Sequence, residues 1–212
     1  MAQVVRPFRG VSAADRLAER RADLLEAGLD ETAQSGVAGL RMKSVCERAG
    51  LARRYFYEHF ANRDELLIAL FDDLIDRVVE RMVPAVDAEP LNLYDRARAA
   101  MDAFLSVFVE DPRRVRLYVE AASMPQLAGR RADAVRRNAE FSAQQVFSVL
   151  GDADPRTRGH VYAVAQVVVI GQADVALAWL RGEIALSRHE YAELVAHVFV
   201  DALSGIYARL TR

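Results

Sequence analysis

Apolar side chains recur at helical spacing along much of the 212-residue chain. Residues three or four apart share one face of a helix, so each such series predicts a helix with one buried face. A β-branched run at residues 167–170 resembles a strand when taken alone, but it lies in a long Ala-rich stretch without turn residues. We assign it to a helix, and the predicted fold class is all-α. The clearest series are Leu67, Leu70, Phe71, Leu74, Val78 and Met82, then Ala97, Met101, Phe104 and Phe108, and later Leu194, Val198, Ala202 and Leu203.

Capping residues and helix breakers divide this pattern into eight or nine helices. Five pairs mark helix starts, namely Asn62 with Glu65, Asn92 with Asp95, Ser187 with Glu190, Asp111 with Pro112, and Asp154 with Pro155. Breaks are expected at residues 84–90, 124–125 and 151–155 and near Gly182. A helix over residues 62–82 would join an N-terminal domain, residues 1–62, to a C-terminal domain, residues 63–212.

The segment before Asn62 predicts a helix-turn-helix. Residues 43–48 favour a short helix, Ala49-Gly50-Leu51 a tight turn with a positive φ at Gly50, and residues 53–60 a second short helix. Phe56 and Phe60, four residues apart, should face inward against Leu24, Val45 and Leu67.

Charge is distributed unevenly along the chain, although the net charge is only -2. Residues 1–63 carry 11 basic and 8 acidic side chains, whereas the remainder carries 17 and 22. Six of the basic residues lie within residues 41–63 and face only Glu47 and Glu58. A polyanion would be attracted to this segment.

A helix-turn-helix places the start of its second helix against base edges in the major groove of DNA. Arg53, Arg54 and Tyr55 occupy that position, and Arg can bind guanine O6 and N7 with two hydrogen bonds. We predict that these three residues read bases. Arg41, Lys43 and Ser44, around the start of the first short helix, complete the predicted DNA-binding set with the phosphate-contacting residues given below.

Three segments resemble the TetR (tetracycline-repressor-type) family of transcriptional regulators: "LLEAGLDETAQSG", "VCERAGLARRYFYEHF" and "NRDELL". A weaker likeness, "WLRGEIALSRHEYAELVAHVF", covers the last two helices of many members, whereas residues 85–175 show only helical patterning. The resemblance implies a homodimer with two N-terminal DNA-binding domains and a C-terminal ligand-binding domain. It also implies phosphate contacts from Tyr57, His59 and Arg63.

Four positions depart from the family pattern: Ala52 replaces the usual Ser cap of the recognition helix, Arg54 a frequent Gly, Arg41 a frequent Thr, and Thr32 an aromatic residue. These differences imply an unusual operator. A missing N-cap costs about 1 kcal/mol, so we expect a recognition helix that is loose until DNA binds.

The C-terminal domain leaves two interpretations open for its aromatic residues. Met101, Phe104, Phe108, Tyr118 and Phe141 are either ordinary core or the lining of an apolar effector site, and only the family resemblance favours the latter. Polar residues on otherwise apolar helices need partners when buried and therefore also mark candidate ligand contacts. They are Asn138, Gln145, Gln166 and Asp174.

Residues 161–170 are apolar nearly all round, which predicts a helix covered by a second subunit. The predicted dimer interface is a four-helix packing of residues 155–181 and 187–210 from each copy, and its residues are Val167, Ile170, Leu194, Val198 and Ala202. Twofold symmetry would require a palindromic operator with half-sites about one helical turn apart.

Other chemistry is not expected. The single cysteine, Cys46, is interpreted as a small core residue, and His189-Glu190 lacks the second His of a zinc-protease helix. No cofactor, metal or catalytic residue is predicted, and the absence of an N-terminal apolar run and of a spanning-length one favours a cytoplasmic protein without a membrane. The rival classes are an all-α carrier or enzyme for apolar ligands, and an RNA-binding regulator, which the narrow major groove of A-form RNA disfavours.

Overall fold

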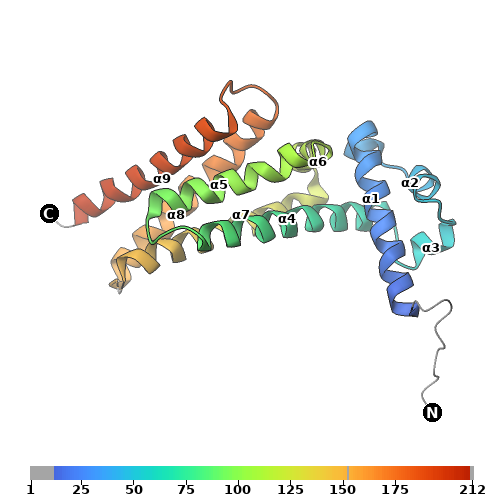
Figure 1. The fold of residues 1–212 in the computed structure, drawn as a ribbon, viewed down its shortest axis with the longest axis horizontal. Helices are drawn as coiled ribbons and strands as arrows, with labels where there is room; N and C mark the ends of the chain where they lie inside the picture. The colour runs from blue at the N-terminus through green and yellow to red at the C-terminus, as the bar shows by residue number, and fades with distance from the viewer. Residues whose placement is uncertain (1–11, 152, 211–212) are drawn as a thin grey trace, which may run out of the picture. The chain divides into compact units, whose positions relative to one another are not determined.

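The computed structural model describes residues 12–151 and 153–210, the last six of them by their backbone only. These residues form nine helices and no strand, which confirms the all-α prediction (Figure 1). The N-terminal residues 1–11, where a signal segment was sought, lie outside the described residues.

The chain divides into two compact units, Met1–Asp73 and Leu74–Arg212, which we call the head and the body. The head contains α1 (Ala13–Gly39), α2 (Met42–Ala49), α3 (Arg53–Tyr57) and the first part of α4 (Arg63–Asp87). The body contains the rest of α4 and the helices α5 (Leu93–Glu110), α6 (Arg113–Ala121), α7 (Pro125–Leu150), α8 (Pro155–Leu180) and α9 (Arg188–Leu210). The predicted domain boundary at residues 62 and 63 falls at the start of α4 and stays a prediction.

The head contains the expected helix-turn-helix around a small apolar core. Leu24, Val45, Phe56, Phe60 and Leu67 are all buried, as the sequence pattern predicts. Gly50 ends α2 in the left-handed region, with φ 66°, and the N–H of Leu51 donates to the carbonyl of Cys46 at 3.0 Å. This turn sets the direction in which α3 leaves α2.

Two predicted boundaries are wrong. The second short helix ends at Tyr57 rather than at residue 60, because the chain continues as a turn in which the His59 N–H donates to the Phe56 carbonyl at 3.0 Å. The helix predicted to end at residue 82 runs on past Pro84 to Asp87, so the break falls late within the expected range 84–90. Met82 and Val86, on either side of Pro84, are buried, and this burial offsets the hydrogen bond that the proline lacks.

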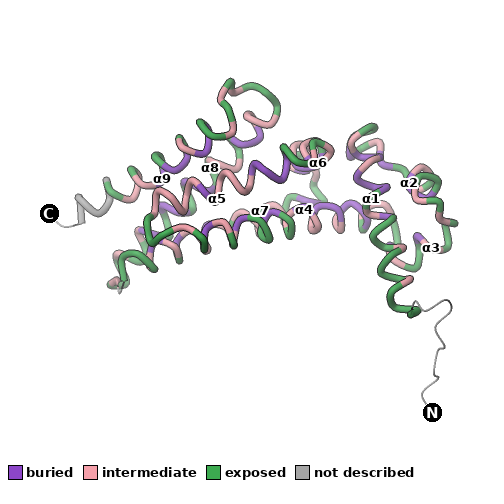
Figure 2. The backbone as a smooth tube through the Cα atoms, in the orientation of Figure 1, coloured by how far each residue is buried: buried purple, intermediate pink, exposed green. Residues whose placement is uncertain are grey.

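The body is built from paired helices. Helix α5 lies alongside α9 and α7 alongside α8 (Figure 1). In Figure 2 buried and exposed residues alternate along α9, as expected for a helix with one covered face, whereas α5 is mostly intermediate or buried. One apolar cluster joins α7, α8 and α9 through Ala143, Val146, Val161, Val164, Ala165, Val168 and Phe199, and a second contains Leu105, Ala176, Tyr191 and Val195.

The predicted capping signals are present at most helix starts of the body. Ser187 and Glu190 form a reciprocal pair at 3.2 and 2.8 Å, and the Asn92 and Asp154 side chains each accept two N–H groups of the following turn. Pro155 is the first residue of α8, whereas Pro112 precedes the first residue of α6. The helix starts are therefore fixed by local sequence.

Helix α8 is long and apolar enough, by length and composition alone, to cross a membrane, and 33% of its most apolar window is buried. The longest apolar run, residues 161–171 with an interruption at Gln166, had predicted a segment too short to span a membrane. The core helix of a soluble protein satisfies the same two criteria, so this finding by itself does not indicate a membrane.

We expect Gly50→Ala to reduce the free energy of unfolding by about 1–2 kcal/mol, because the left-handed conformation is unfavourable for alanine. A steric clash is not the cause, since nothing lies within 4 Å of the added Cβ. Gly129→Ala is the matched control: Gly129 lies inside α7 with equally open space, so alanine should stabilise by about 0.5–1 kcal/mol. Urea denaturation of both variants measures the difference, and equal effects at the two positions would contradict the role of the turn.

Candidate nucleic-acid interface

Most of the exposed cationic side chains among the described residues of the head lie on the helix-turn-helix. Arg41, Lys43, Arg53 and Arg54 are exposed, as is the aromatic side chain of Tyr57. Ser44, in the first turn of α2, is half-buried. Helix α2 packs on α1 and α3 packs on α2, so the short helices are held with their polar side chains outward. This arrangement presents a positive surface to a polyanion.

The predicted base-reading residue Arg54 folds back onto its neighbour. Its guanidinium donates to the Tyr55 hydroxyl at 2.7 Å and lies 4.6 Å from the centre of the Tyr55 ring. Arg20 of α1 lies 4.4 Å from the centre of the same ring. Tyr55 is therefore flanked by two cations, while Arg53 beside it is exposed.

Sequence reasoning missed Arg20. In addition to its contact with Tyr55, its guanidinium forms an ion pair with Glu58 at 3.5 Å. The sequence feature that could have revealed Arg20 is the repetition of arginine at residues 16, 20 and 21 in the first turns of α1. This repetition places positive charge on a face that the helix-turn-helix covers. Arg20 thus belongs to the electrostatic surface of the recognition helix.

Arg63 and Arg48 are engaged within the head. Arg63 donates to the carbonyl of Ala38 at 3.2 Å and to the Asp64 carboxylate at 3.3 Å. Arg48 donates to Gln34 at 2.8 Å and to the buried carboxylate of Glu31 at 3.4 Å. These two arginines tie α2 and the start of α4 to α1, so part of the basic cluster stabilises the head.

His59 is half-buried, and its Nε2 atom is buried without a hydrogen-bond partner among the described residues. Burial of the imidazole lowers the pKa of His59 below its ordinary value, and the positive charges of Arg20 and Arg21 lower it further, against the opposing effect of Glu58. The folded head therefore favours the neutral imidazole near pH 7. A phosphate contact from His59 would be a neutral N–H donation.

Ala52 leaves the start of α3 without a side-chain cap, as expected from the sequence. Only the Tyr55 N–H donates to the Ala52 carbonyl there, at 2.9 Å. Thr32, where the family pattern has an aromatic residue, is fully buried and donates to the Gly28 carbonyl at 2.9 Å. Both departures are accommodated inside the head.

Three of the predicted effector residues come together in the body. The rings of Phe104, Phe108 and Tyr118 form a triangle with centroid distances of 5.1, 5.7 and 5.1 Å. Met101 packs with Phe104 against the second apolar cluster. Phe141 is half-buried on α7 and stands outside this triangle.

The polar candidates are more dispersed. Gln145 accepts from Arg96 at 2.6 Å, and Asp174 accepts from Arg131 at 2.6 Å although its side chain is 68% exposed. Asn138 is half-buried, whereas Gln166 is exposed on α8. The burial expected for Gln166 and Asp174 is wrong for the single chain, because both lie on the outward face of α8.

Four of the predicted interface residues are exposed apolar side chains. Val167 is 72%, Ile170 51%, Leu194 48% and Val198 48% exposed. Ala202 differs, because it is half-buried and packs against the first apolar cluster of its own chain. The outward faces of α8 and α9 are thus apolar surfaces without cover in the single chain.

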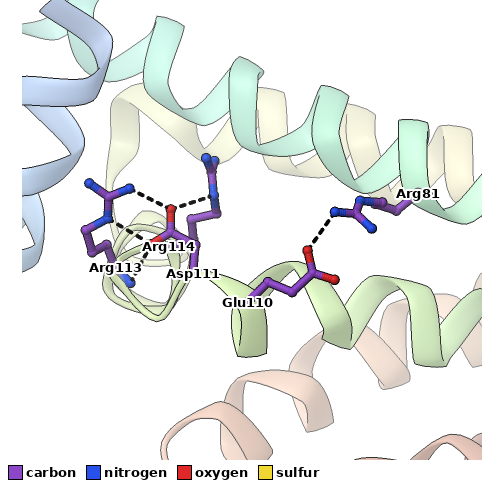
Figure 3. Close-up of polar contacts among 5 residues, drawn as sticks. All are labelled: Arg81, Glu110, Asp111, Arg113 and Arg114. Carbon is purple, nitrogen blue, oxygen red and sulfur yellow. Dashed lines mark hydrogen bonds and ion pairs between the residues drawn. The ribbon is translucent and has the colours of Figure 1, made fainter. Parts of the chain in front are cut away.

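The junction of α4, α5 and α6 carries polar contacts that sequence reasoning also missed (Figure 3). Arg81 of α4 binds Glu110 at 2.6 Å, and Asp111 binds Arg113 at 2.8 Å and buried Arg114 at 3.2 Å. Hydrogen bonding from Arg113 holds the pKa of Asp111 below its ordinary value. Asp111 thus fixes the α5–α6 turn through side-chain bonds to both arginines and to the Arg113 N–H at 3.3 Å, although α6 begins after Pro112 without the predicted side-chain cap.

Among the residues that the structure describes, no group of three His, Cys, Asp or Glu side chains could hold a metal ion. Cys46 is buried, and burial raises the pKa of its thiol. His189 pairs with Glu193 at 3.2 Å instead.

Comparison with known proteins agrees with this geometry. Residues 24–70, which span the helix-turn-helix, match the family described as "Bacterial regulatory proteins, tetR family". Over 182 residues the chain is 27% identical to the HTH-type transcriptional activator FasR of Mycolicibacterium smegmatis, which amounts to 84% of this chain and 81% of that protein.

Solved structures share the whole fold. A TetR-like transcriptional regulator from Rhodococcus sp. RHA1 has a TM-score of 0.68 at 21% identity, covering 92% of this chain and 99% of its own. FadR from Bacillus subtilis, solved in complex with stearoyl-CoA, has a TM-score of 0.61 at 13% identity, covering 87% and 98%.

A helix-turn-helix with an exposed basic surface, joined to a helical body, defines a DNA-binding transcriptional regulator. Residues 24–70 match the TetR family of these regulators, and the fold is shared with solved TetR-like regulators.

The lowered pKa of His59 predicts a pH-dependent stability. In the window between the folded pKa and the ordinary value of 6.5, the unfolded chain binds more protons than the folded one. The melting temperature of the wild type should therefore fall as the pH is lowered from 7.5 through 6.5, and calorimetry should show a shallower fall for His59→Asn. Superimposable pH profiles of the two proteins would exclude His59 as the cause.

Proposed function

We propose that this regulator binds a palindromic operator as a homodimer and leaves it when a mostly apolar small molecule enters the body. The exposed basic surface of the helix-turn-helix is the observation that carries the DNA-binding part. Release by the effector makes the chain a repressor in the absence of ligand. The activating role in the name of FasR belongs to that protein.

On the DNA, Arg53 and Arg54 read base edges from the start of α3. The guanidinium of Arg54 leaves Tyr55 to do so, and guanine offers it two acceptors in place of one hydroxyl and one ring. Arg41, Lys43, Ser44, Tyr57 and the neutral His59 contact phosphates and sugars, while Arg63 combines a phosphate contact with its anchoring of Ala38.

Dimerisation covers the outward faces of α8 and α9. Val167, Ile170, Leu194 and Val198 are too large and too exposed to be left in water as one contiguous surface. Burial in a membrane fits less well, because the same face of α8 carries exposed Gln166 and Asp174. A twofold interface here gives a cytoplasmic dimer with two heads, which supplies enough base contacts for site selection.

The effector site lies around Phe104, Phe108 and Tyr118, with Met101, Phe141 and the neighbouring polar residues contributing. Stearoyl-CoA, bound by the FadR relative, makes acyl thioesters the first class to test. A ligand shifts the equilibrium only by its difference in affinity for the DNA-bound and released arrangements.

The experiment that tests DNA recognition compares Arg54→Ala with Lys43→Ala in gel shifts on the operator and on random duplex DNA. Arg54→Ala should lose about 1–3 kcal/mol of discrimination at one base pair. Lys43→Ala, which breaks only an exposed pair with Glu47, should weaken both duplexes alike and lower the salt slope by about 0.9 per contact. Equal losses on both duplexes for Arg54→Ala would refute base reading, and no binding of duplex DNA by the wild type would refute the function.

Assembly is tested by Val198→Arg, which would place an unpaired charge in the interface. Sedimentation should then show a monomer, and specific DNA binding should be lost although every DNA-contacting residue remains. Leu91→Arg is the matched control, because Leu91 is 62% exposed outside α8 and α9 and should leave the dimer intact. A wild type that sediments as a monomer at micromolar concentration would overturn the proposal.

A further inference from the structure

The hydroxyl of Tyr191 is a buried polar group without a hydrogen-bond partner among the described residues. The residue is only 1% exposed, and its ring stacks on Trp179 with 5.9 Å between centroids and an interplanar angle of 8°. The indole N–H is already engaged, because it donates to the Leu186 carbonyl at 2.8 Å. Packing therefore holds the ring in place, while the hydroxyl at its end has no hydrogen-bond partner among the described residues.

A second unsatisfied donor lies in the same part of the body. The Nε atom of Arg131 is buried and has no hydrogen-bond partner in the described part of the chain, although a terminal nitrogen of the same guanidinium binds Asp174 at 2.6 Å. A buried donor left unsatisfied is costly and uncommon in folded proteins. Two such atoms in one helical body call for an explanation.

Tyr118 connects the two donors. Its ring contacts Phe104 at 5.7 Å, and Phe104 packs against the apolar cluster that contains Tyr191. Burial raises the pKa of Tyr118 to about 12, with Arg131 opposing and Asp174 adding to the effect. The pKa of Tyr191 is likewise raised to about 12, first by burial and then by Tyr118. Both phenols therefore stay protonated and can donate.

The chemistry of this group is that of a receptor for a hydrogen-bond acceptor. The Tyr191 hydroxyl and the Arg131 Nε–H are donors without a partner among the described residues, and the Tyr118 hydroxyl is a further phenol donor. The carboxylate of Asp174 is already bound to Arg131. The formal charges of Arg131 and Asp174 cancel. A carboxylate ligand would bring an uncompensated charge among apolar side chains, whereas a carbonyl oxygen would only need the hydrogen bonds.

We propose that Tyr191, Tyr118 and Arg131 bind the uncharged carbonyl group of the effector, an ester, thioester or ketone oxygen, while its apolar part lies against Phe104 and Met101. This inference rests on the proposed function, because it names the polar end of the same effector site. It assigns the ligand class as neutral carbonyl compounds with an apolar chain. Free acids and hydrocarbons of equal length are then poorer ligands.

The test uses the full-length protein and three matched series with chains of 8 to 16 carbons: methyl esters, free acids and alkanes. We expect at least one ester to raise the melting temperature, and the acid and the alkane of that length to bind at least tenfold more weakly by calorimetric titration. Failure of every ester to bind, or equal affinity for ester and alkane, would overturn the proposal. Tighter binding of the acid would overturn the choice of an uncharged group.

Tyr191→Phe separates the binding role from a structural one. Removing an unsatisfied hydroxyl should leave the free protein as stable as the wild type or raise its melting temperature by about 2–4 °C, yet reduce ester affinity at least tenfold. Tyr162→Phe on α8, where the tyrosine is 38% exposed, is the matched control and should leave ester affinity unchanged. Ester affinity that stays within twofold of the wild type in Tyr191→Phe would refute the assignment.

Gel shifts with the operator distinguish this inference from the proposed function. Tyr191→Phe should bind the operator as the wild type does but resist release by the ester. If alkanes release the protein as well as esters do, the carbonyl assignment fails and the effector mechanism stands. If no ligand that binds the body releases the operator, the effector mechanism itself fails.

Discussion

The recognition helix is too short to be stable by itself, and this constraint governs the whole head. Helix α3 has five residues and no side-chain cap, and an isolated helix of that length does not form in water. It persists because Phe56, fully buried within it, and Phe60, just beyond its end, enter the core that Leu24 and Leu67 complete. The left-handed turn at Gly50 supplies the required direction, and the bonds of Arg48 to Glu31 and Gln34 hold α2 in place. DNA recognition therefore depends on apolar packing within the head.

The body is subject to a comparable constraint, because α8 carries apolar side chains on two faces. Val161, Ala165 and Val168 face the core of their own chain, whereas Val167 and Ile170 on the same helix face outward. A helix that is apolar on all sides has a low amphipathic signal and needs cover on both sides. The inner face is covered by α7 and α9, and the outer face is the one that the proposed dimer would cover.

Much of the fold could be predicted from local sequence. Ser187 with Glu190, Asn92 and Asp154 mark helix starts because their side chains bond to the next few N–H groups, and Gly50 marks a turn because other residues avoid a positive φ. The end of the helix at residue 82 was predicted too early, because a proline removes only one hydrogen bond of the helix and the burial of Met82 and Val86 on either side of Pro84 offsets that loss. The end of α3 was overestimated because periodic apolar residues continue into the turn at His59 and Phe60.

The candidate sites were predictable only in part, because the sequence gives residue types and not their partners. The basic cluster was found, but nothing in it distinguished Arg48 and Arg63, bound to carboxylate, amide or carbonyl groups of the head, from exposed Arg53. Arg20 was missed because its partner Tyr55 lies 35 residues away along the chain. Tyr191 and Arg131 were missed because they lack partners among the described residues, and an unsatisfied donor is recognisable only once its surroundings are known.

The resting position of Arg54 on Tyr55 has a kinetic meaning as well. An arginine that already has a partner binds a base by exchange, so on most DNA sequences it has little to gain by moving. Under the base reading proposed for Arg54, the protein would scan DNA with its phosphate contacts alone and engage this side chain only where guanine outcompetes the tyrosine.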